Sequence, residues 1–113
     1  MFWQNIKDVY FDYDKYNLRT GDSATVDQDA AFLKQHADIK IVIEGHCDDR
    51  GSEEYNIALG ENRGETMKNA LVNDGVAAGR IRVTSVGKEK PFCTEDNDQC
   101  WQQNRRAHLI LDR

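Results

Sequence analysis

The strongest constraint on the fold is a long helical pattern that stands between two short apolar segments. Residues 39–44 alternate isoleucine with other residues and predict a buried strand that stops at Gly45. Ser52 is a good helix cap, the helical pattern after it continues to about Asn73, and residues 81–86 predict another strand. Because a strand–helix–strand unit forms a right-handed crossover between parallel strands, this helix must pack on a sheet.

The flanking segments complete the order of elements. Residues 8–13 carry the β-branched and aromatic residues of a first strand, residues 14–17 predict a loop, and residues 107–111 predict a last strand. Between the first two strands, Thr20 or Asp22 can cap another helix. Its inward positions recur at helical spacing and its outward positions are polar: Val26, Ala30, Leu33 and Ala37 against Asp27, Gln28, Lys34 and Gln35.

The element order predicts an α+β fold, arranged as a two-layer α/β sandwich. Strand, helix, strand, helix, strand and a last strand imply a mixed four-stranded sheet with the helices packed on it. Apolar residues make up 39% of the 113 residues, and no repeat, linker or low-complexity tract divides them. Residues 1–113 are therefore expected to form a single domain.

The charge balance argues against nucleic acid as a partner. Fifteen Lys and Arg stand against twenty Asp and Glu, a net charge of −5, and no basic cluster exceeds a pair. The apolar runs fall far short of the ~20 residues that cross a bilayer, so no transmembrane segment is expected. The chain also starts without the basic and apolar regions of a secretion signal, which predicts either a cytoplasmic chain or one whose leader has been removed.

Three cysteines bear on the compartment. Cys93 and Cys100 flank a short acidic loop, CTEDNDQC, which a disulfide between them would close, leaving Cys47 unpaired. That bridge would favour an oxidising compartment. Two reduced surface thiols are the alternative, because spacing alone does not show that the two side chains face one another.

The candidate ligand site is the loop of residues 45–51, because loops that leave the carboxyl end of a strand are the usual ligand sites of open α/β sheets. On the next helix, one stripe carries Asn56, Gly60, Arg63 and Met67. Asp48 in the loop and Arg63 on the stripe can together hold a ligand with an ammonium and a carboxylate, which is the charge pattern of an amino acid. A solvated charged turn and an internal Asp48–Arg63 salt bridge are the structural alternatives.

Two further features belong near this loop. Gly60 and Gly64 each cost about 1 kcal/mol of helix propensity, which indicates either that bulk is unwelcome beside Arg63 or that the helix packs closely on the sheet. Arg105 and Arg106 come just before the last strand. One of them can line the same cleft, and a plain charged turn is the alternative.

Four motifs, EGHCDDRG, EYNIALGENR, SVGKEKP and NRRA, resemble those of the OmpA-like peptidoglycan-binding domains in order and spacing from Asp8 to Leu111. Within that family, DDRG, EYNIALGE and GKEKP are most similar to the peptidoglycan-associated lipoprotein (Pal) branch. The resemblance implies non-covalent binding of the meso-diaminopimelate in the peptidoglycan stem peptide, with no catalysis and no cofactor. It thereby implies an anchor that joins the outer membrane or an envelope complex to the cell wall.

The resemblance also assigns residues. Asp48 and Arg63 match the family's aspartate and arginine that recognise meso-diaminopimelate. Further ligand contacts are implied at Asn56, Leu59, Tyr13, Asp14, Asn104 and Arg105. Cys47 departs from the family's usual threonine or alanine, and Gly60 and Gly64 replace other small residues, so the affinity is expected to differ from the family norm.

The resemblance implies a cellular setting as well. It suggests the periplasm of a Gram-negative bacterium, with attachment to the outer membrane, and a Tol-type periplasmic β-propeller protein as a second partner. Pal-like proteins are tethered through a lipidated cysteine. This chain carries no lipid-attachment signal, so we expect a domain cut from a longer precursor, attached to the membrane only through an anchor outside it.

Three other functions compete with wall binding. His46, Cys47, Asp48 and Asp49 are potential metal ligands, but no CxxC, HxxxH or HExxH spacing closes a site. Cys47 as a nucleophile lacks a dedicated third residue and an oxyanion-hole motif. The stronger rival is a protein-interaction module that contacts a Tol-like or stator partner, with wall binding secondary.

Overall fold

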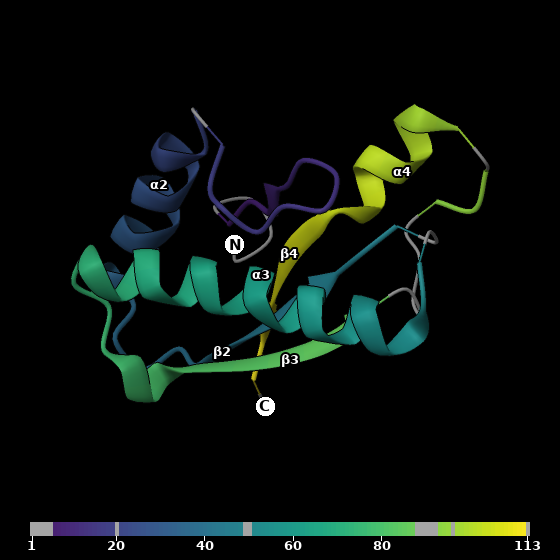
Figure 1. Ribbon diagram of the computed structural model, residues 1–113. Helices are drawn as coiled ribbons and strands as arrows, with labels where there is room; N and C mark the ends of the chain where they lie inside the picture. The colour runs from purple at the N-terminus through teal and green to yellow at the C-terminus, as the bar shows by residue number, and fades with distance from the viewer. Residues whose placement is uncertain (1–5, 20, 49–50, 88–92, 96, 113) are drawn as a thin grey trace.

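The chain folds into a mixed four-stranded sheet with two long helices on one side, as the element order predicts (Figure 1). The computed structural model describes residues 6–19, 21–48, 51–87, 93–95 and 97–112. The strands lie in the order β1–β4–β2–β3, and their bounds are β1 Val9–Tyr10, β2 Ile41–His46, β3 Ile81–Gly87 and β4 Arg106–Leu111. β2 and β3 are parallel, whereas β4 runs antiparallel to both β1 and β2.

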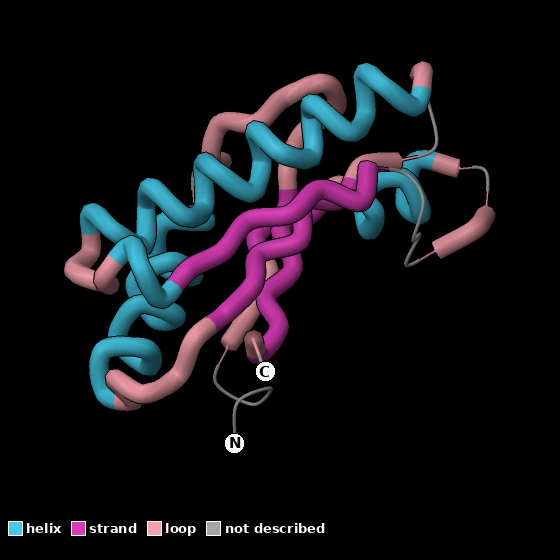
Figure 2. The backbone as a smooth tube through the Cα atoms, turned by 90° about the horizontal axis from the view of Figure 1, so that it is seen from below, coloured by secondary structure: helices cyan, strands magenta, loops and turns pink. Residues whose placement is uncertain are grey.

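The helices form the second layer. They are α2 (Asp22–Gln35), α3 (Glu53–Asn73), the 3-10 turn η1 (Ala78–Arg80) and α4 (Asp98–Asn104). α3 packs across β2 and β3, and α2 packs on β1 and against α3. Figure 2 shows this layering from below, with the cyan helix α3 lying along the magenta strands. α4 leads directly into β4 and places the start of that strand beside the end of β2.

The core lies between the two helices and the sheet. Side chains at alternate positions of the strands point into it, as the period of two in a strand requires. Burying each large aliphatic or aromatic side chain contributes about 1.5–3 kcal/mol. The largest apolar side chains that are almost fully buried are Phe11, Leu33, Ile41, Ile43, Met67, Leu71 and Leu109.

Both ends of α3 are defined by capping residues, in agreement with the sequence prediction. At its start, the Ser52 hydroxyl accepts a hydrogen bond from the backbone N–H of Tyr55 at 3.1 Å. At its end, Gly75 adopts a left-handed φ of 104° and donates to the carbonyl of Val72. Val76 then donates to the carbonyl of Leu71, which completes a Schellman cap. The 21-residue helix therefore begins and ends where local chemistry requires.

The helix glycines allow α3 to lie directly on the sheet. A Cβ at Gly60 would lie 2.7 Å from the carbonyl oxygen of Gly45, and a Cβ at Gly64 would lie 2.6 Å from Val83 Cγ1. The two interpretations of these glycines are thus decided in favour of close helix–sheet packing. The close approach brings the first half of α3 down to the end of β2, where the candidate ligand loop starts.

The first strand is shorter than predicted. Residues 8–13 were expected to be extended, but only Val9–Tyr10 pairs with β4. The chain then turns at residues 12–15, with Lys15 donating to the Asp12 carbonyl and Asp14 at a φ of 58°. The carbonyls of residues 11, 12 and 15 accept arginine side chains instead of strand partners. Residues 14–17 form the predicted loop.

The bounds of α2 and β2 also differ from the prediction. Gly21, with a φ of 101°, occupies the cap position of α2 without a side-chain bond, and Asp22 is its first helical residue. Thr20 lies outside the described residues. α2 ends at Gln35, and the backbone N–H of the next residue, His36, donates to the Leu33 carbonyl. Ala37 therefore lies beyond the helix, and it is exposed. β2 starts at Ile41, two residues late, and runs through Gly45 to His46.

The acidic segment near the C-terminus is partly helical instead of being a simple loop. Asn97 caps α4 by accepting from the N–H of Cys100, a local bond that alternation in the sequence does not reveal. In the structure, a disulfide joins Cys93 to Cys100, the pair whose spacing favoured a bridge. Among the described residues, none of the helices combines the length and hydrophobicity needed to span a bilayer.

Candidate functional site

A small pocket lies where the turn after β1, the end of β2 and the first half of α3 meet. Its cavity volume is about 30 Å³. Six of the residues implied by the family resemblance line it together, although they are spread over 51 positions of the chain. They are Tyr13, Asp14, Asp48, Asn56, Leu59 and Arg63, joined by Cys47, Gly51 and Tyr55.

Arg63 is the most buried large side chain of this pocket, with 1% of its surface exposed. Its guanidinium donates to three backbone carbonyls: Nε to Lys15 at 2.8 Å, Nη1 to His46 at 3.0 Å and Nη2 to Asp12 at 3.1 Å. It also lies over the ring of Phe11, 5.4 Å from the centroid. Burial lowers the pKa of Arg63, but a guanidinium stays charged at neutral pH.

Asp48 is the buried anion of the pocket, with 4% of the residue exposed. Its carboxylate forms an ion pair with Arg105, 3.2 Å from Oδ2 to Nη1. The Arg105 side chain continues to the Phe11 carbonyl at 2.9 Å and to Gln102 Oε1 at 3.0 Å. The cation that holds Asp48 thus comes from Arg105, the residue between α4 and β4, whereas the guanidinium of Arg63 is held by carbonyls.

The last two residues implied by the resemblance behave differently from one another. Arg105 does not line the cavity but contacts it through Asp48. Asn104 is not brought to the pocket: its side-chain amide donates to the Cys93 carbonyl at 2.8 Å and accepts the Cys93 N–H at 3.1 Å. A two-way bond of this kind holds the disulfide-linked segment against α4. Asp49 and residues 88–91 of the SVGKEKP motif lie outside the described residues.

Cys47 lines the same pocket, but its chemistry is that of a packed thiol. It is 3% exposed, and its Sγ donates to the Asn56 carbonyl at 3.1 Å. Burial raises its pKa to about 11, so the thiol stays protonated at neutral pH. Because the thiolate is the nucleophilic form, this environment does not suit a thiol enzyme.

Tyr55 is the main pocket residue that the sequence analysis did not single out. It stands on the first turn of α3, next to Asn56, and is 49% exposed. A large aromatic at an exposed position beside a helix cap was the available signal, but a single exposed tyrosine is too common to indicate a site. Only the turn at residues 12–15, packed alongside, makes it part of a pocket wall.

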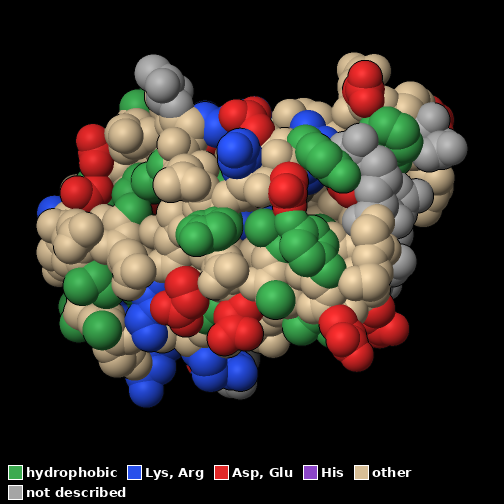
Figure 3. All heavy atoms as spheres, in the orientation of Figure 1, with side chains coloured by type: hydrophobic (Ala, Val, Ile, Leu, Met, Phe, Trp, Pro, Cys, Tyr) green, Lys and Arg blue, Asp and Glu red, His purple; other side chains and the backbone are tan. Residues whose placement is uncertain are grey.

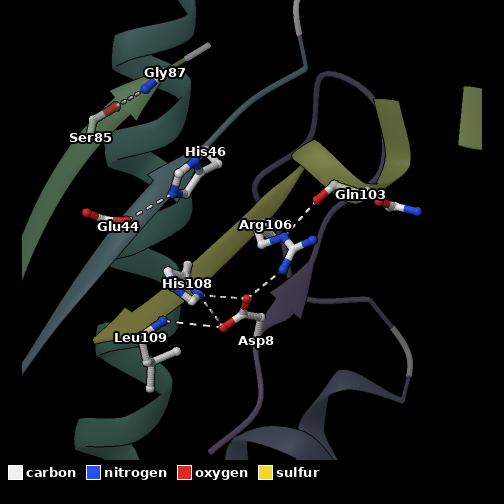
Figure 4. A network of polar contacts seen from close by, with 9 residues as sticks. All are labelled: Asp8, Glu44, His46, Ser85, Gly87, Gln103, Arg106, His108 and Leu109. Carbon is white, nitrogen blue, oxygen red and sulfur yellow. Dashed lines mark hydrogen bonds and ion pairs between the residues drawn. The ribbon is translucent and has the colours of Figure 1, made fainter. Parts of the chain in front are cut away.

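A separate polar cluster occupies the opposite face of the sheet (Figure 4). Asp8 contacts His108 Nδ1 at 2.9 Å and Arg106 Nη1 at 2.9 Å, while His46 Nε2 lies 3.2 Å from Glu44 Oε1. Burial alone would raise the pKa of Asp8, but the hydrogen bonds and charges of His108 and Arg106 outweigh it and lower the pKa. Its charged groups are paired with one another, which is the pattern of a structural network.

Metal coordination finds no support in the part of the chain that the structure describes. No group of three or more His, Cys, Asp or Glu side chains converges there in a way that could hold a metal ion. The potential ligands named from the sequence are separated by their partners. His46 pairs with Glu44 and Asp48 with Arg105, while the Cys47 thiol donates to a backbone carbonyl.

This fold and pocket define a class of protein, and the comparisons with known proteins name it. The model of the OmpA family matches residues 10–106, so the chain belongs to the OmpA family. A peptidoglycan-associated lipoprotein of Rhizobium meliloti is 43% identical over 97% of the chain, and one of Pasteurella multocida is 42% identical over 94%. The chain spans 63% of the first relative's length and 71% of the second's.

Solved structures agree with this assignment. The crystal structure of the peptidoglycan-associated lipoprotein from Burkholderia pseudomallei matches with a TM-score of 0.90 and 40% identity, covering 94% of this chain and 90% of that one. The C-terminal domain of Helicobacter pylori MotB matches with a TM-score of 0.87 but only 17% identity, covering 96% of this chain and 85% of that one. The second likeness shows a shared fold and no more.

Proposed function

We propose that this chain binds peptidoglycan non-covalently, by holding the meso-diaminopimelate of a stem peptide between Asp48 and Arg63. The observation that carries this proposal is the convergence of a buried carboxylate and a buried guanidinium in one pocket of an OmpA-family domain. Relatives named for their association with peptidoglycan support the ligand class. The proposal describes a binding module that needs no catalytic group and no cofactor.

The charges of the pocket suit the free end of diaminopimelate, which carries an ammonium and a carboxylate on one carbon. A guanidinium has five N–H groups, and three of those of Arg63 donate to backbone carbonyls. The remaining two, one on each terminal nitrogen, can hold a carboxylate in a two-pronged bond. Asp48 can accept hydrogen bonds from the ammonium, while Arg105 holds the Asp48 carboxylate in position. Rigid partners of this kind lower the entropy lost on binding.

The setting follows from the ligand. A domain that binds the stem peptide would anchor the outer membrane or an envelope complex to the cell wall, in the periplasm of a Gram-negative bacterium. The competing function is a module that mainly contacts a Tol-type β-propeller or a stator partner. The pocket's buried, matched charges favour the small zwitterionic ligand, because protein–protein interfaces are depleted of charge at their core.

Calorimetric titration with two muropeptides tests the proposal. One carries meso-diaminopimelate and the other carries lysine, which lacks the terminal carboxylate. We expect selective binding of the diaminopimelate form and a loss of at least about 30-fold in affinity for Asp48→Asn, since removing one member of a buried charge pair costs about 2–5 kcal/mol. Equal binding of both muropeptides would contradict the role of Arg63.

Asp8→Asn is the matched control for Asp48→Asn. Asp8 is also a partly buried carboxylate paired with an arginine, Arg106, at 2.9 Å, but it belongs to the opposite face of the sheet. It should lose stability without losing affinity for the muropeptide. If the folded wild-type chain bound neither muropeptide yet captured a purified Tol-type β-propeller protein, the partner function would replace the one proposed here.

A further inference from the structure

A second hollow adjoins the charged pocket along the outer side of α3. Its volume is about 200 Å³, several times that of the charged pocket, and it shares Asp14, Tyr55 and Leu59 with it. The residues that belong to this hollow and not to the charged pocket are Tyr16, Ala58 and Asn62. The two spaces therefore lie next to one another, with these three shared residues between them.

Exposed aromatic rings distinguish this hollow from the rest of the surface. Large hydrophobic side chains with more than a third of their surface exposed are confined, among the described residues, to Tyr13, Tyr16, Tyr55 and Ile57. Two of these, Tyr16 at 47% and Tyr55 at 49%, line the hollow. On the face drawn in Figure 3, green hydrophobic side chains gather over the N-terminal half of α3 and the loop above it.

The charge of the hollow narrows the choice of ligand. Among the described residues of its lining, Asp14 is the one charged residue, and Asn62 and the two tyrosine hydroxyls are neutral hydrogen-bonding groups. The rest of a stem peptide carries carboxylates, which the nearby carboxylate of Asp14 disfavours. The sugars of peptidoglycan are neutral and rich in hydroxyl groups, and the C–H faces of their rings suit the negative face of a tyrosine ring.

We propose that this hollow, the tyrosine subsite, binds the glycan of peptidoglycan, with a sugar ring against Tyr16 and Tyr55 and its hydroxyls bonded by Asn62 and Asp14. The inference rests on the proposed function, since the stem peptide in the charged pocket delivers the glycan. Two residues join diaminopimelate to the sugar and span about 7 Å when extended, so the sugar stays close to the bound diaminopimelate. Because the two ligand parts are covalently linked, sugar contacts add to affinity without a second association step.

The test compares two soluble ligands by calorimetry: the tripeptide that ends in meso-diaminopimelate, and the same tripeptide carrying its disaccharide. We expect the disaccharide to raise the affinity of the wild-type chain about 10-fold. Tyr16→Ala and Asn62→Ala should remove that gain and leave the affinity for the bare tripeptide unchanged, because neither residue lines the charged pocket. Tyr16→Phe should keep most of the gain if ring stacking supplies it.

Ile57→Ala is the matched control, an exposed apolar side chain of α3 that lines neither space. It should bind both ligands as the wild type does. Equal affinity of the wild type for both ligands, or an equal loss for both in Tyr16→Ala, would overturn the tyrosine subsite and leave peptide binding standing. Binding of neither ligand would overturn the proposed function and the subsite with it.

Discussion

Two arginines of this protein each donate to three backbone carbonyls, but their surroundings differ. Arg63 donates to the carbonyls of Asp12, Lys15 and His46 at 2.8–3.1 Å. Arg80 donates to the carbonyls of Leu33, His36 and Ile39 at 2.7–2.9 Å. The partners of Arg80 belong to one short segment at the end of α2, where unpaired carbonyls and the helix dipole favour a cation. The Arg80 side chain therefore caps the C-terminal end of α2, although it lies more than 40 residues away in the sequence.

The partners of Arg63 come instead from two segments that are far apart in the sequence, and its guanidinium borders the pocket that contains Asp48. Three hydrogen bonds to backbone carbonyls are thus common to both arginines and cannot by themselves identify a ligand-binding residue. What distinguishes Arg63 is the opposite charge and the cavity beside it. This difference can be tested by removing each side chain in turn.

Arg63→Ala should give the largest effect. Three carbonyls, of which that of His46 is fully buried, would lose their donor at about 1–3 kcal/mol each before water enters, so we expect a loss of roughly 4 kcal/mol in the free energy of unfolding. Chemical denaturation measures it. Arg63→Lys is the informative second variant, because an ammonium keeps the charge but cannot reach three carbonyls in the fixed directions of a guanidinium. It should recover part of the stability and little of the muropeptide affinity.

Arg80→Ala should destabilise the fold less, by about 1–3 kcal/mol, and leave muropeptide binding unchanged. Arg80 is only partly buried, so water can reach the carbonyls that it leaves. Denaturation and calorimetry on the same sample measure both quantities. A drop in affinity in a folded Arg80→Ala chain would break the comparison, because it would show that this end of α2 communicates with the pocket.

Asp29 differs from both arginines, because it is a buried ionisable side chain with one oxygen left without a hydrogen bond from any described residue. It is 0% exposed; its Oδ1 accepts the Lys7 N–H at 2.9 Å, and its Oδ2 has no partner among the described residues. Burial raises its pKa to about 7, with the Asp8 charge adding to the rise. The folded state therefore binds a proton that the unfolded state releases above about pH 4.

The stability contributed by the protonated carboxyl should be complete below about pH 4 and lost as the pH rises through 7. Asp29→Asn cannot ionise, so its free energy of unfolding should exceed that of the wild type by about 1–2 kcal/mol at pH 8 and by little at pH 4. The difference between the two chains cancels the titration of other groups, such as His46. A constant difference across this range would rule out the raised pKa of Asp29.

The secondary structure shows how far local sequence patterns extend. α3 and β3 agree with the prediction to within a residue because their limits are local: the Ser52 cap, the Gly75 turn and the alternation of residues 81–86. β1 and α2 were misjudged where tertiary contacts compete with local preference. The carbonyls after Tyr10 are taken by Arg63 and Arg105, residues that lie 48 or more positions away along the chain.

The sequence alone determined the order of the four strands and the two long helices, the strand-to-helix loop that carries Asp48, and the helix stripe that carries Arg63, because each depends on neighbours within a few residues. The tertiary structure alone decided the charge pairing. Asp48 meets Arg105, 57 positions away, and Arg63 meets the turn after β1. The burial of Asp29 was decided in the same way. Such pairings depend on which segments the sheet order brings together, and no local periodicity encodes that choice.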